Sequence, residues 1–225
     1  MLNKLKMKKI KISQKQIFLN GEGDNWYLRN KKKINNTLKN KIVINILNNH
    51  LNKRYKRKIN FLEIGCSNGS LLLNIKKKEN FNIFGVDPSK KAINELKNKG
   101  VNSHIGTADK ILFNNKSMDI IFYGFCLYLC DQKDYFKIVK SADRILRAKG
   151  KIIILDFYSK KIKKNSYKHD ERIQCIKRDF SKIFTVKKFK LVYQKLFNYS
   201  YMFKENKYIK DDRIAISVLE RNKNV

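Results

Sequence analysis

Short apolar runs alternate with amphipathic segments through the first two thirds of the chain. The runs have the length and composition of buried strands, and the segments between them repeat apolar residues at helical spacing. Strands are predicted at 59–64, 82–86, 101–105, 118–123 and 151–157, and helices at 34–51, 70–78, 90–99 and 134–147. Because strands alternate with helices, the pattern predicts an α/β fold, with a mostly parallel sheet and helices on both faces.

The pattern changes after residue 158. Residues 186–193 and 213–219 are β-rich runs separated by a polar loop, which predicts an antiparallel strand pair at one edge of the sheet. With the five strands before them, these two make a seven-stranded sheet. Residues 159–184 are polar and aromatic, and a helix with irregular flanks is expected there, covering the mouth of the sheet.

Composition fits a globular protein. The 225 residues suffice for one domain with a sizeable core, and the hydrophobic fraction is 42%. No run approaches the roughly 20 apolar residues of a membrane-spanning helix, and no signal peptide is read at the N-terminus. The cysteines lack metal-ligand spacing, so reduced thiols and a cytoplasmic location are expected, and no metal is; they are Cys66, Cys126, Cys130 and Cys175.

The formal charge of +33 admits two explanations. Clustered basic residues would indicate a nucleic-acid partner. Lysine is instead scattered through every segment of a chain rich in Lys, Asn and Ile, as codon bias in an AT-rich genome would produce, and arginine is the minority among the 52 basic residues. Nucleic acid is therefore disfavoured as a partner, although the charge should attract an anionic substrate.

The most informative motif is a strand that ends in an acid and a glycine turn. Glu63 precedes Gly65 and Gly69, which open a predicted helix, and Asp87 ends the next strand. Glycines let the backbone turn sharply and let a ligand approach. An acid about 20 residues beyond such a turn is placed to accept hydrogen bonds from a ribose.

Residues 63–69, Glu-Ile-Gly-Cys-Ser-Asn-Gly, resemble the first motif of class I S-adenosylmethionine-dependent methyltransferases. Ser67 stands where many members have glycine. Residues 106–109 resemble the loop after the third strand, and residues 119–125 resemble the fourth strand and its loop. The resemblance covers roughly residues 59–157 and implies a Rossmann-like methyltransferase fold with S-adenosylmethionine as cofactor.

In this resemblance Asp87 binds both ribose hydroxyls and Asp109 receives the adenine amino group, with a helix N-cap as the alternative role for Asp109. Residues after the fourth strand would make backbone contacts to the methionine part. The expected cofactor-binding residues are Glu63, Gly65, Cys66, Ser67, Gly69, Asp87, Pro88, Ala108, Asp109, Tyr123, Gly124 and Phe125.

The loop after the fourth strand disfavours two acceptor classes. Tyr123-Gly124-Phe125-Cys126 lacks the Asn/Asp-Pro-Pro-Tyr/Phe motif of nucleic-acid amino-group methyltransferases. Cys126 and Cys130 also lack the proline setting of a nucleophilic cysteine and are expected to be buried thiols. The loop resembles that of small-molecule methyltransferases.

Two stretches have the composition of a substrate cover. Residues 21–30 hold the only tryptophan and resemble the N-terminal segment of methyltransferases in bacterial sugar and surface-polysaccharide pathways, with a capped helix as the alternative. Residues 167–181 include His169, a weak candidate for a general base and otherwise a surface histidine. No catalytic residue is assigned beyond it, and the candidate substrate residues are Trp26, Tyr27, Arg29, Tyr128 and Tyr167.

The sequence therefore predicts one methyltransferase domain over 1–225, with a lid and helix at 1–56, a cofactor-binding core at 57–157, and a substrate cover with antiparallel strands at 158–225. The expected activity is methyl transfer to O or N of a small polar acceptor, favouring an anionic sugar, nucleotide-sugar or polysaccharide precursor. An RNA or ribosomal-protein methyltransferase and a non-catalytic cofactor-binding scaffold are the alternatives.

Overall fold

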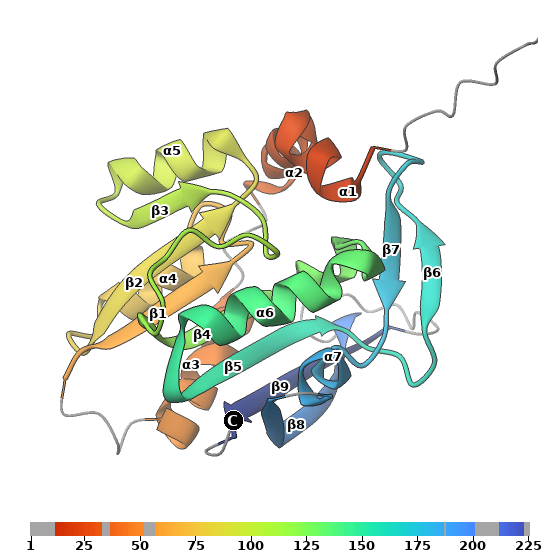
Figure 1. The fold of residues 1–225 in the computed structure, drawn as a ribbon. Coiled ribbons are helices and arrows are strands. Elements are labelled where there is room, and N and C mark those ends of the chain that lie inside the picture. The colour runs from red at the N-terminus through yellow and green to blue at the C-terminus, as the bar shows by residue number, and fades with distance from the viewer. Residues whose placement is uncertain (1–11, 33–36, 52–56, 187, 201–211, 223–225) are drawn as a thin grey trace, which may run out of the picture.

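The computed structural model describes residues 12–32, 37–51, 57–186, 188–200 and 212–222. Its centre is a seven-stranded sheet in the order β3-β2-β1-β4-β5-β9-β8 (Figure 1). The first five strands are parallel, and β9 and β8 are antiparallel to their neighbours. The strands are β1 (Ile59–Ile64), β2 (Phe81–Asp87), β3 (Asn102–Ile105), β4 (Met118–Gly124), β5 (Leu146–Phe157), β8 (Phe189–Asn198) and β9 (Arg213–Arg221). The sequence-based prediction of this fold is confirmed.

Helices cover both faces of the sheet, because successive side chains of each strand point to opposite sides. In β4, Ile120 and Phe122 pack in one core with helices α3, α4 and α5, whereas Ile121 and Tyr123 pack in the other core with α6 and α7. The helices are α3 (Thr37–Leu51), α4 (Ser70–Lys76), α5 (Lys90–Asn98), α6 (Tyr135–Ile145) and α7 (Ser181–Thr185).

The prediction of a helix with irregular flanks over 159–184 is wrong for most of that segment. Most of this segment forms a second, two-stranded antiparallel sheet of β6 (Lys163–Ser166) and β7 (Gln174–Lys177), followed by α7. Only one side of the hairpin is apolar: Tyr167 and Ile173 are buried at its turn, and Ile176 joins the sheet core. The sequence did not indicate this strand pair, because Lys163–Ser166 contains no apolar residue and so shows no alternation.

The segment before α3 is helical as well. It consists of α1 (Gln14–Ile17), a π-helical turn η1 (Phe18–Glu22) and α2 (Gly23–Asn30). Gly21 has φ 144°, which kinks the segment, and a Cβ on Gly23 would lie 3.0 Å from the backbone nitrogen of Ser89. The two glycines thus allow α2 to lie directly on the start of α5. Residues 12–30 are called the strap below.

The described residues contain no helix long and apolar enough to cross a membrane. The four cysteines are free thiols, as expected. The expected domain divisions and cytoplasmic location stay predictions.

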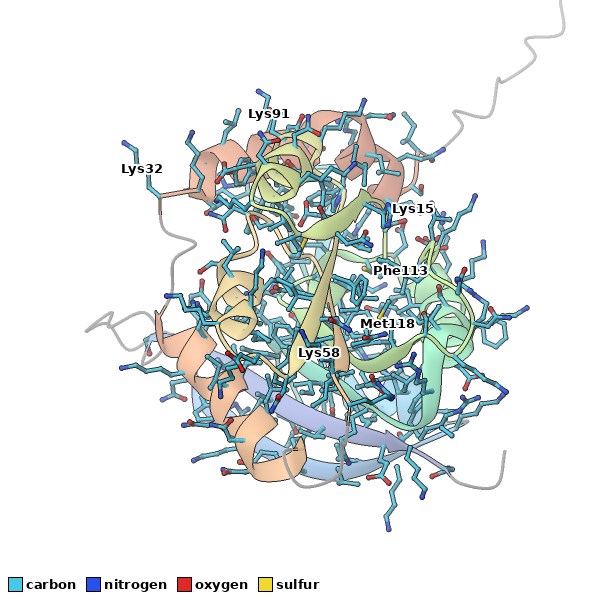
Figure 2. The ribbon with its side chains drawn as sticks, turned by 90° about the vertical axis from the view of Figure 1, so that its left-hand side faces the viewer. Lys15, Lys32, Lys58, Lys91, Phe113 and Met118 are labelled. Atoms are coloured by element: carbon cyan, nitrogen blue, oxygen red, sulfur yellow. The ribbon has the colours of Figure 1, made fainter. Side chains whose placement is uncertain are left out.

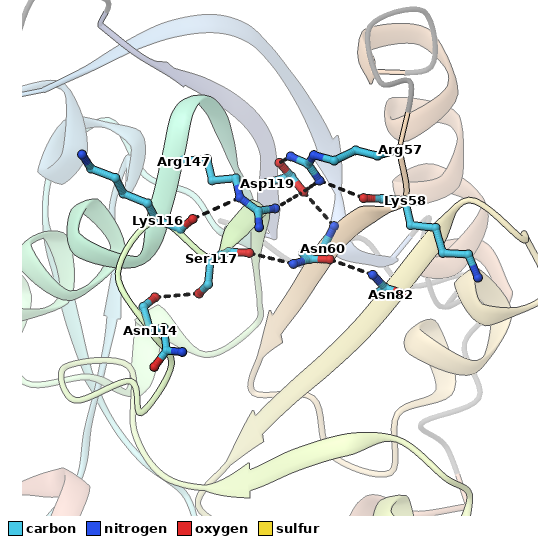
Figure 3. A network of polar contacts seen from close by, with 9 residues as sticks. All are labelled: Arg57, Lys58, Asn60, Asn82, Asn114, Lys116, Ser117, Asp119 and Arg147. Atoms are coloured by element: carbon cyan, nitrogen blue, oxygen red, sulfur yellow. Dashed lines mark hydrogen bonds and ion pairs between the residues drawn. The ribbon is translucent and has the colours of Figure 1, made fainter.

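The edge of the sheet opposite the carboxyl ends of its parallel strands is held by one buried acid, Asp119 (Figure 3). Its carboxylate accepts hydrogen bonds from Arg57 at 2.6 and 2.8 Å, from Arg147 at 2.9 Å and from the backbone N–H of Asn60 at 2.9 Å. Burial opposes ionisation, yet these partners lower the pKa of Asp119. The network therefore joins the start of β1 to β4 and β5.

We expect Asp119→Asn to lower the free energy of unfolding at pH 7 by roughly 2–4 kcal/mol, because it removes the charge that both arginines share. The lowered pKa means that this contribution is full above about pH 4, the unfolded value, and is lost as the pH falls through the folded pKa. Urea unfolding of both proteins at pH 7 and pH 3.5 measures it. Glu171→Gln, on the exposed hairpin turn, is the control, and equal losses in the two variants would contradict the assignment.

Candidate functional site

A cavity of about 390 Å³ lies at the carboxyl ends of the parallel strands, which is where ligands bind in open α/β sheets. Its volume is within the range of small-molecule sites, about 300–1,000 Å³. The strap covers it and contributes Lys15, Phe18, Gly23, Trp26 and Asn30 to its lining. Nine of the expected cofactor-binding residues line it: Gly65, Cys66, Ser67, Asp87, Pro88, Ala108, Asp109, Gly124 and Phe125.

The turn after β1 is built from left-handed residues. Gly65 and Gly69 both have φ 72°, and Ser67 has φ 48° at the position where glycine is common in the resembling family. A Cβ on Gly65 would lie 2.8 Å from Cβ of Cys126, and one on Gly69 would lie 2.3 Å from Cδ1 of Leu96. Gly69 does not line the cavity and packs against α5, so its expected role at the ligand stays a prediction.

Asp87 connects this turn to the next one. Its Oδ2 accepts the backbone N–H of Ser67 and its Oδ1 accepts that of Ser89, both at 2.8 Å. Burial raises the pKa of Asp87 to about 6, against the lowering effect of these two hydrogen bonds. Each oxygen keeps a lone pair, so the carboxylate can accept two further hydrogen bonds on its cavity side.

Glu63 lies behind the cavity and does not line it. Its Oε1 pairs with Lys39 at 3.3 Å, and its Oε2 is buried without a hydrogen-bond partner. Burial raises the pKa of Glu63 to about 7, although Lys39 opposes this. Lys39 itself lines the cavity, which the sequence had not indicated.

Asp109 is already engaged by the strap. Lys15 Nζ lies 2.5 Å from Asp109 and 3.2 Å from Asp134, and the backbone N–H of Gln14 donates to Asp131 at 2.9 Å. Burial works against ionisation, but Lys15 and the Thr107 hydroxyl lower the pKa of Asp109. Asp109 belongs to a turn closed by a Thr107–Lys110 bridge and caps no helix.

The loop after β4 is held by a residue that the sequence had not singled out. Asp156, buried near the end of β5, accepts the backbone N–H groups of Leu127 at 2.9 Å and Tyr128 at 3.3 Å. Burial raises the pKa of Asp156 to about 7, opposed by its backbone hydrogen bonds. The side chain of Tyr123 is buried against Phe184 in the sheet core and does not line the cavity, so the expected backbone contact of this residue stays a prediction.

The candidate substrate residues divide into two groups. Trp26 and Tyr128 line the cavity. Tyr27, Arg29 and Tyr167 do not, and they are corrected to structural roles. Tyr27 donates to Glu95 of α5, while Arg29 pairs with Glu22 and donates to the Tyr167 hydroxyl at 3.1 Å. Tyr167 also donates to Glu22 at 2.8 Å, so this group binds the strap to the β6–β7 hairpin.

His169 is corrected as well. It is exposed on the hairpin turn, packs edge-on against Tyr167 at 5.4 Å between ring centroids, and does not line the cavity. Its role as a general base therefore has no support from the cavity lining. Cys126 and Cys130 do line the cavity, and burial raises the pKa of both thiols, which favours packing over reactivity.

The family described as "Methyltransferase domain" matches residues 62–154. This segment, which is less than half of the chain, is similar to that family. It contains the glycine turn, Asp87, Asp109 and the loop after β4, which line the cavity together with the strap. No curated protein matches the chain.

Solved structures with low sequence identity share the fold. A SAM-dependent methyltransferase from Methanosarcina mazei is 15% identical, with 78% of this chain and 96% of that one covered and a TM-score of 0.61. An S-adenosylmethionine-dependent methyltransferase from Mesorhizobium loti is 9% identical, with 73% of this chain and 92% of that one covered and a TM-score of 0.57. The [4+2]-cyclase SpnF is 11% identical, with 81% of this chain and 80% of that one covered and a TM-score of 0.64. At such identities the likeness shows the fold alone.

The domain match and the fold support S-adenosylmethionine as the cofactor and methyl transfer as the activity. The residues present fit this group. Ser67 Oγ is a buried cavity-lining hydroxyl without a partner, and Asp87 presents acceptor capacity beside it. Four carboxylates against two lysines line the cavity, namely Asp87, Asp109, Asp131 and Asp134 against Lys15 and Lys39, which suits a cationic sulfonium.

We expect Asp156→Asn to change the pH dependence of stability. The folded pKa of about 7 exceeds the reference value of 3.8, so ionisation destabilises the native state. Relative to the variant, the wild type should lose stability as the pH rises from about 4 to 7, by at most about 4 kcal/mol.

Chemical denaturation at half-unit pH intervals tests this. A difference in the free energy of unfolding that is the same at every pH reflects the changed hydrogen bonds. Only a difference that varies with pH reports the titration of Asp156. Parallel curves for wild type and Asp156→Asn would contradict the buried, ionisable state of Asp156.

We expect Lys15→Met to loosen the strap, because the ion pairs of Lys15 with Asp109 and Asp134 are lost. Partly exposed pairs contribute about 1 kcal/mol, so amide exchange within residues 14–30 should become about fivefold faster. Hydrogen-exchange mass spectrometry measures this, with Lys133→Met as an exposed neighbouring control. Unchanged exchange in Lys15→Met would show that the pairs do not hold the strap.

Proposed function

We propose that this chain transfers a methyl group from S-adenosylmethionine to an oxygen or nitrogen of a small polar acceptor. The favoured acceptor is the sugar part of a nucleotide sugar or polysaccharide precursor. The observation that carries the proposal is the cavity itself, where Asp87, the orphaned Ser67 hydroxyl and the glycine turn meet under the strap.

The cofactor supplies an electrophilic methyl group on a sulfonium when it is bound. The protein's part is to bind and orient. Asp87 would accept hydrogen bonds from the ribose hydroxyls, Asp109 and Ala108 would hold the adenine, and the loop of Gly124 and Phe125 would bound the methionine part. Orientation of this kind contributes several kcal/mol in favourable systems, up to about 7–11. The strap covers the cavity.

The charge distribution favours a small acceptor whose anionic part lies outside the cavity. Both lysines of the lining are paired with acids, Lys15 with Asp109 and Lys39 with Glu63, so the interior does not attract an anion. The exterior is strongly basic, and its lysines are spread over the surface, as Lys32, Lys58 and Lys91 illustrate (Figure 2). A nucleotide sugar whose sugar lies inside the cavity and whose diphosphate lies at the basic surface would fit both the paired interior and the charged exterior.

RNA or ribosomal-protein methylation is the second candidate. The observation that favours it is the β6–β7 hairpin, since residues 160–178 contain eight lysines and arginines against two acids. Methyl uptake from labelled S-adenosylmethionine distinguishes the two candidates. Incorporation into UDP-sugars supports the first, and incorporation only into ribosomal RNA or ribosomal protein supports the second.

We expect Asp87→Ala to weaken binding of S-adenosylhomocysteine by roughly 10- to 100-fold, because each hydrogen bond to a charged acceptor contributes about 1.5–3 kcal/mol. Wild-type affinity should also fall as the pH decreases through about 6, where Asp87 takes up a proton, and the variant should lack this dependence. Calorimetry measures both. Glu79→Ala, an exposed acid after α4, is the control, and wild-type affinity in Asp87→Ala would refute the proposed site.

A further inference from the structure

Four aromatic residues gather at one end of the cavity. Phe125, Tyr128, Phe157 and Tyr199 all line it, and we call them the aromatic wall. Phe157 is central: its ring centroid lies 4.9 Å from that of Tyr128, 5.2 Å from Tyr199 and 5.4 Å from Phe125. Lys177 of β7 places its Nζ 5.2 Å from the Phe157 centroid.

The wall is separated from the proposed nucleoside end by the order of the strands. Asp87 ends β2, whereas Phe125 follows β4, Phe157 ends β5 and Tyr199 follows β8. In the sheet, β1 lies between β2 and β4, and β5 lies further away still. The carboxylates of Asp109, Asp131 and Asp134 are engaged by the strap, outside the wall.

The wall is held rigidly. Phe125 has φ 51°, an uncommon backbone conformation for a bulky residue, and its N–H donates to the carbonyl of Leu155 at 2.8 Å. Strained conformations of this kind persist only where the surroundings enforce them, and they cluster at functional sites. Asp156 fixes the backbone of Tyr128 on the same loop.

The geometry points to the aromatic wall as the acceptor subsite, and we propose that it binds a ring that stacks on it, either a pyranose through its C–H face or a planar heterocycle. This rests on the proposed function. Aromatic side chains offer broad apolar faces and few hydrogen-bonding groups, so they select for ring shape. Lys177 at the edge of the wall would face an anionic substituent on such a ring.

Saturation-transfer NMR on protein loaded with S-adenosylhomocysteine tests the proposal, with UDP-glucose and UDP-N-acetylglucosamine as probes. Transfer strongest to the pyranose protons identifies the sugar as the stacked ring. Transfer strongest to uracil H5 and H6 identifies the base, which also supports a ring-stacking subsite.

Phe157→Leu keeps apolar volume but removes the central ring, and we expect it to weaken binding of these probes about three- to tenfold. Tyr199→Leu should also weaken binding of the probes, and it replaces Phe157→Leu as the test variant if Phe157→Leu does not fold. Phe136→Leu, an exposed phenylalanine of α6, is the matched control. Calorimetry should show unchanged affinity for S-adenosylhomocysteine in all three variants.

Absence of transfer to every probe in the loaded wild type, or wild-type probe affinity in both wall variants, would overturn the subsite. Loss of S-adenosylhomocysteine affinity together with probe affinity in the wall variants would also overturn it, because the wall would then belong to the cofactor site. Failure of the wild type to bind S-adenosylhomocysteine is a different result and refutes the proposed function itself.

Discussion

The site depends on two carboxylates that sit at strand ends and accept backbone N–H groups from the loops beside them. Asp87 fixes the turn after β1 and the start of α5, and Asp156 fixes the loop after β4. Burying a charge is costly unless hydrogen bonds compensate, and the raised pKa values of both residues express that cost. The loops are thereby held in place before any ligand arrives, which is the condition for orienting two reactants.

The protein combines a basic exterior with an acidic cavity. A formal charge of +33 surrounds a lining in which carboxylates outnumber lysines. The interior thus suits a cationic cofactor, while the exterior attracts anionic molecules at long range. The strap is attached to the start of α5 through Asp24 and to the β6–β7 hairpin through Glu22, so it is anchored on two sides of the cavity it covers.

Sequence reasoning predicted the sheet well, because its strands are short apolar runs with β-branched residues and its helices are amphipathic. It also located the glycine turn and Asp87, since these follow directly from strand ends. It did not predict the hairpin at 163–177, because the first strand, Lys163–Ser166, is wholly polar. The sequence also did not indicate the roles of Lys15, Lys39 and Asp156. Nothing in the local sequence around these residues marks them, and only the tertiary fold brings them to the cavity.

The fold does not by itself determine the reaction, as the likeness to a [4+2]-cyclase demonstrates. The account therefore depends on where the cofactor binds, and a crystal structure with S-adenosylhomocysteine tests that most directly. We expect the ribose against Asp87 and the amino-acid part beside Gly65 and Gly124, with the rings of Tyr128, Phe157 and Tyr199 left uncovered. A ligand bound elsewhere, or a cavity that stays vacant at saturating ligand, would contradict the account.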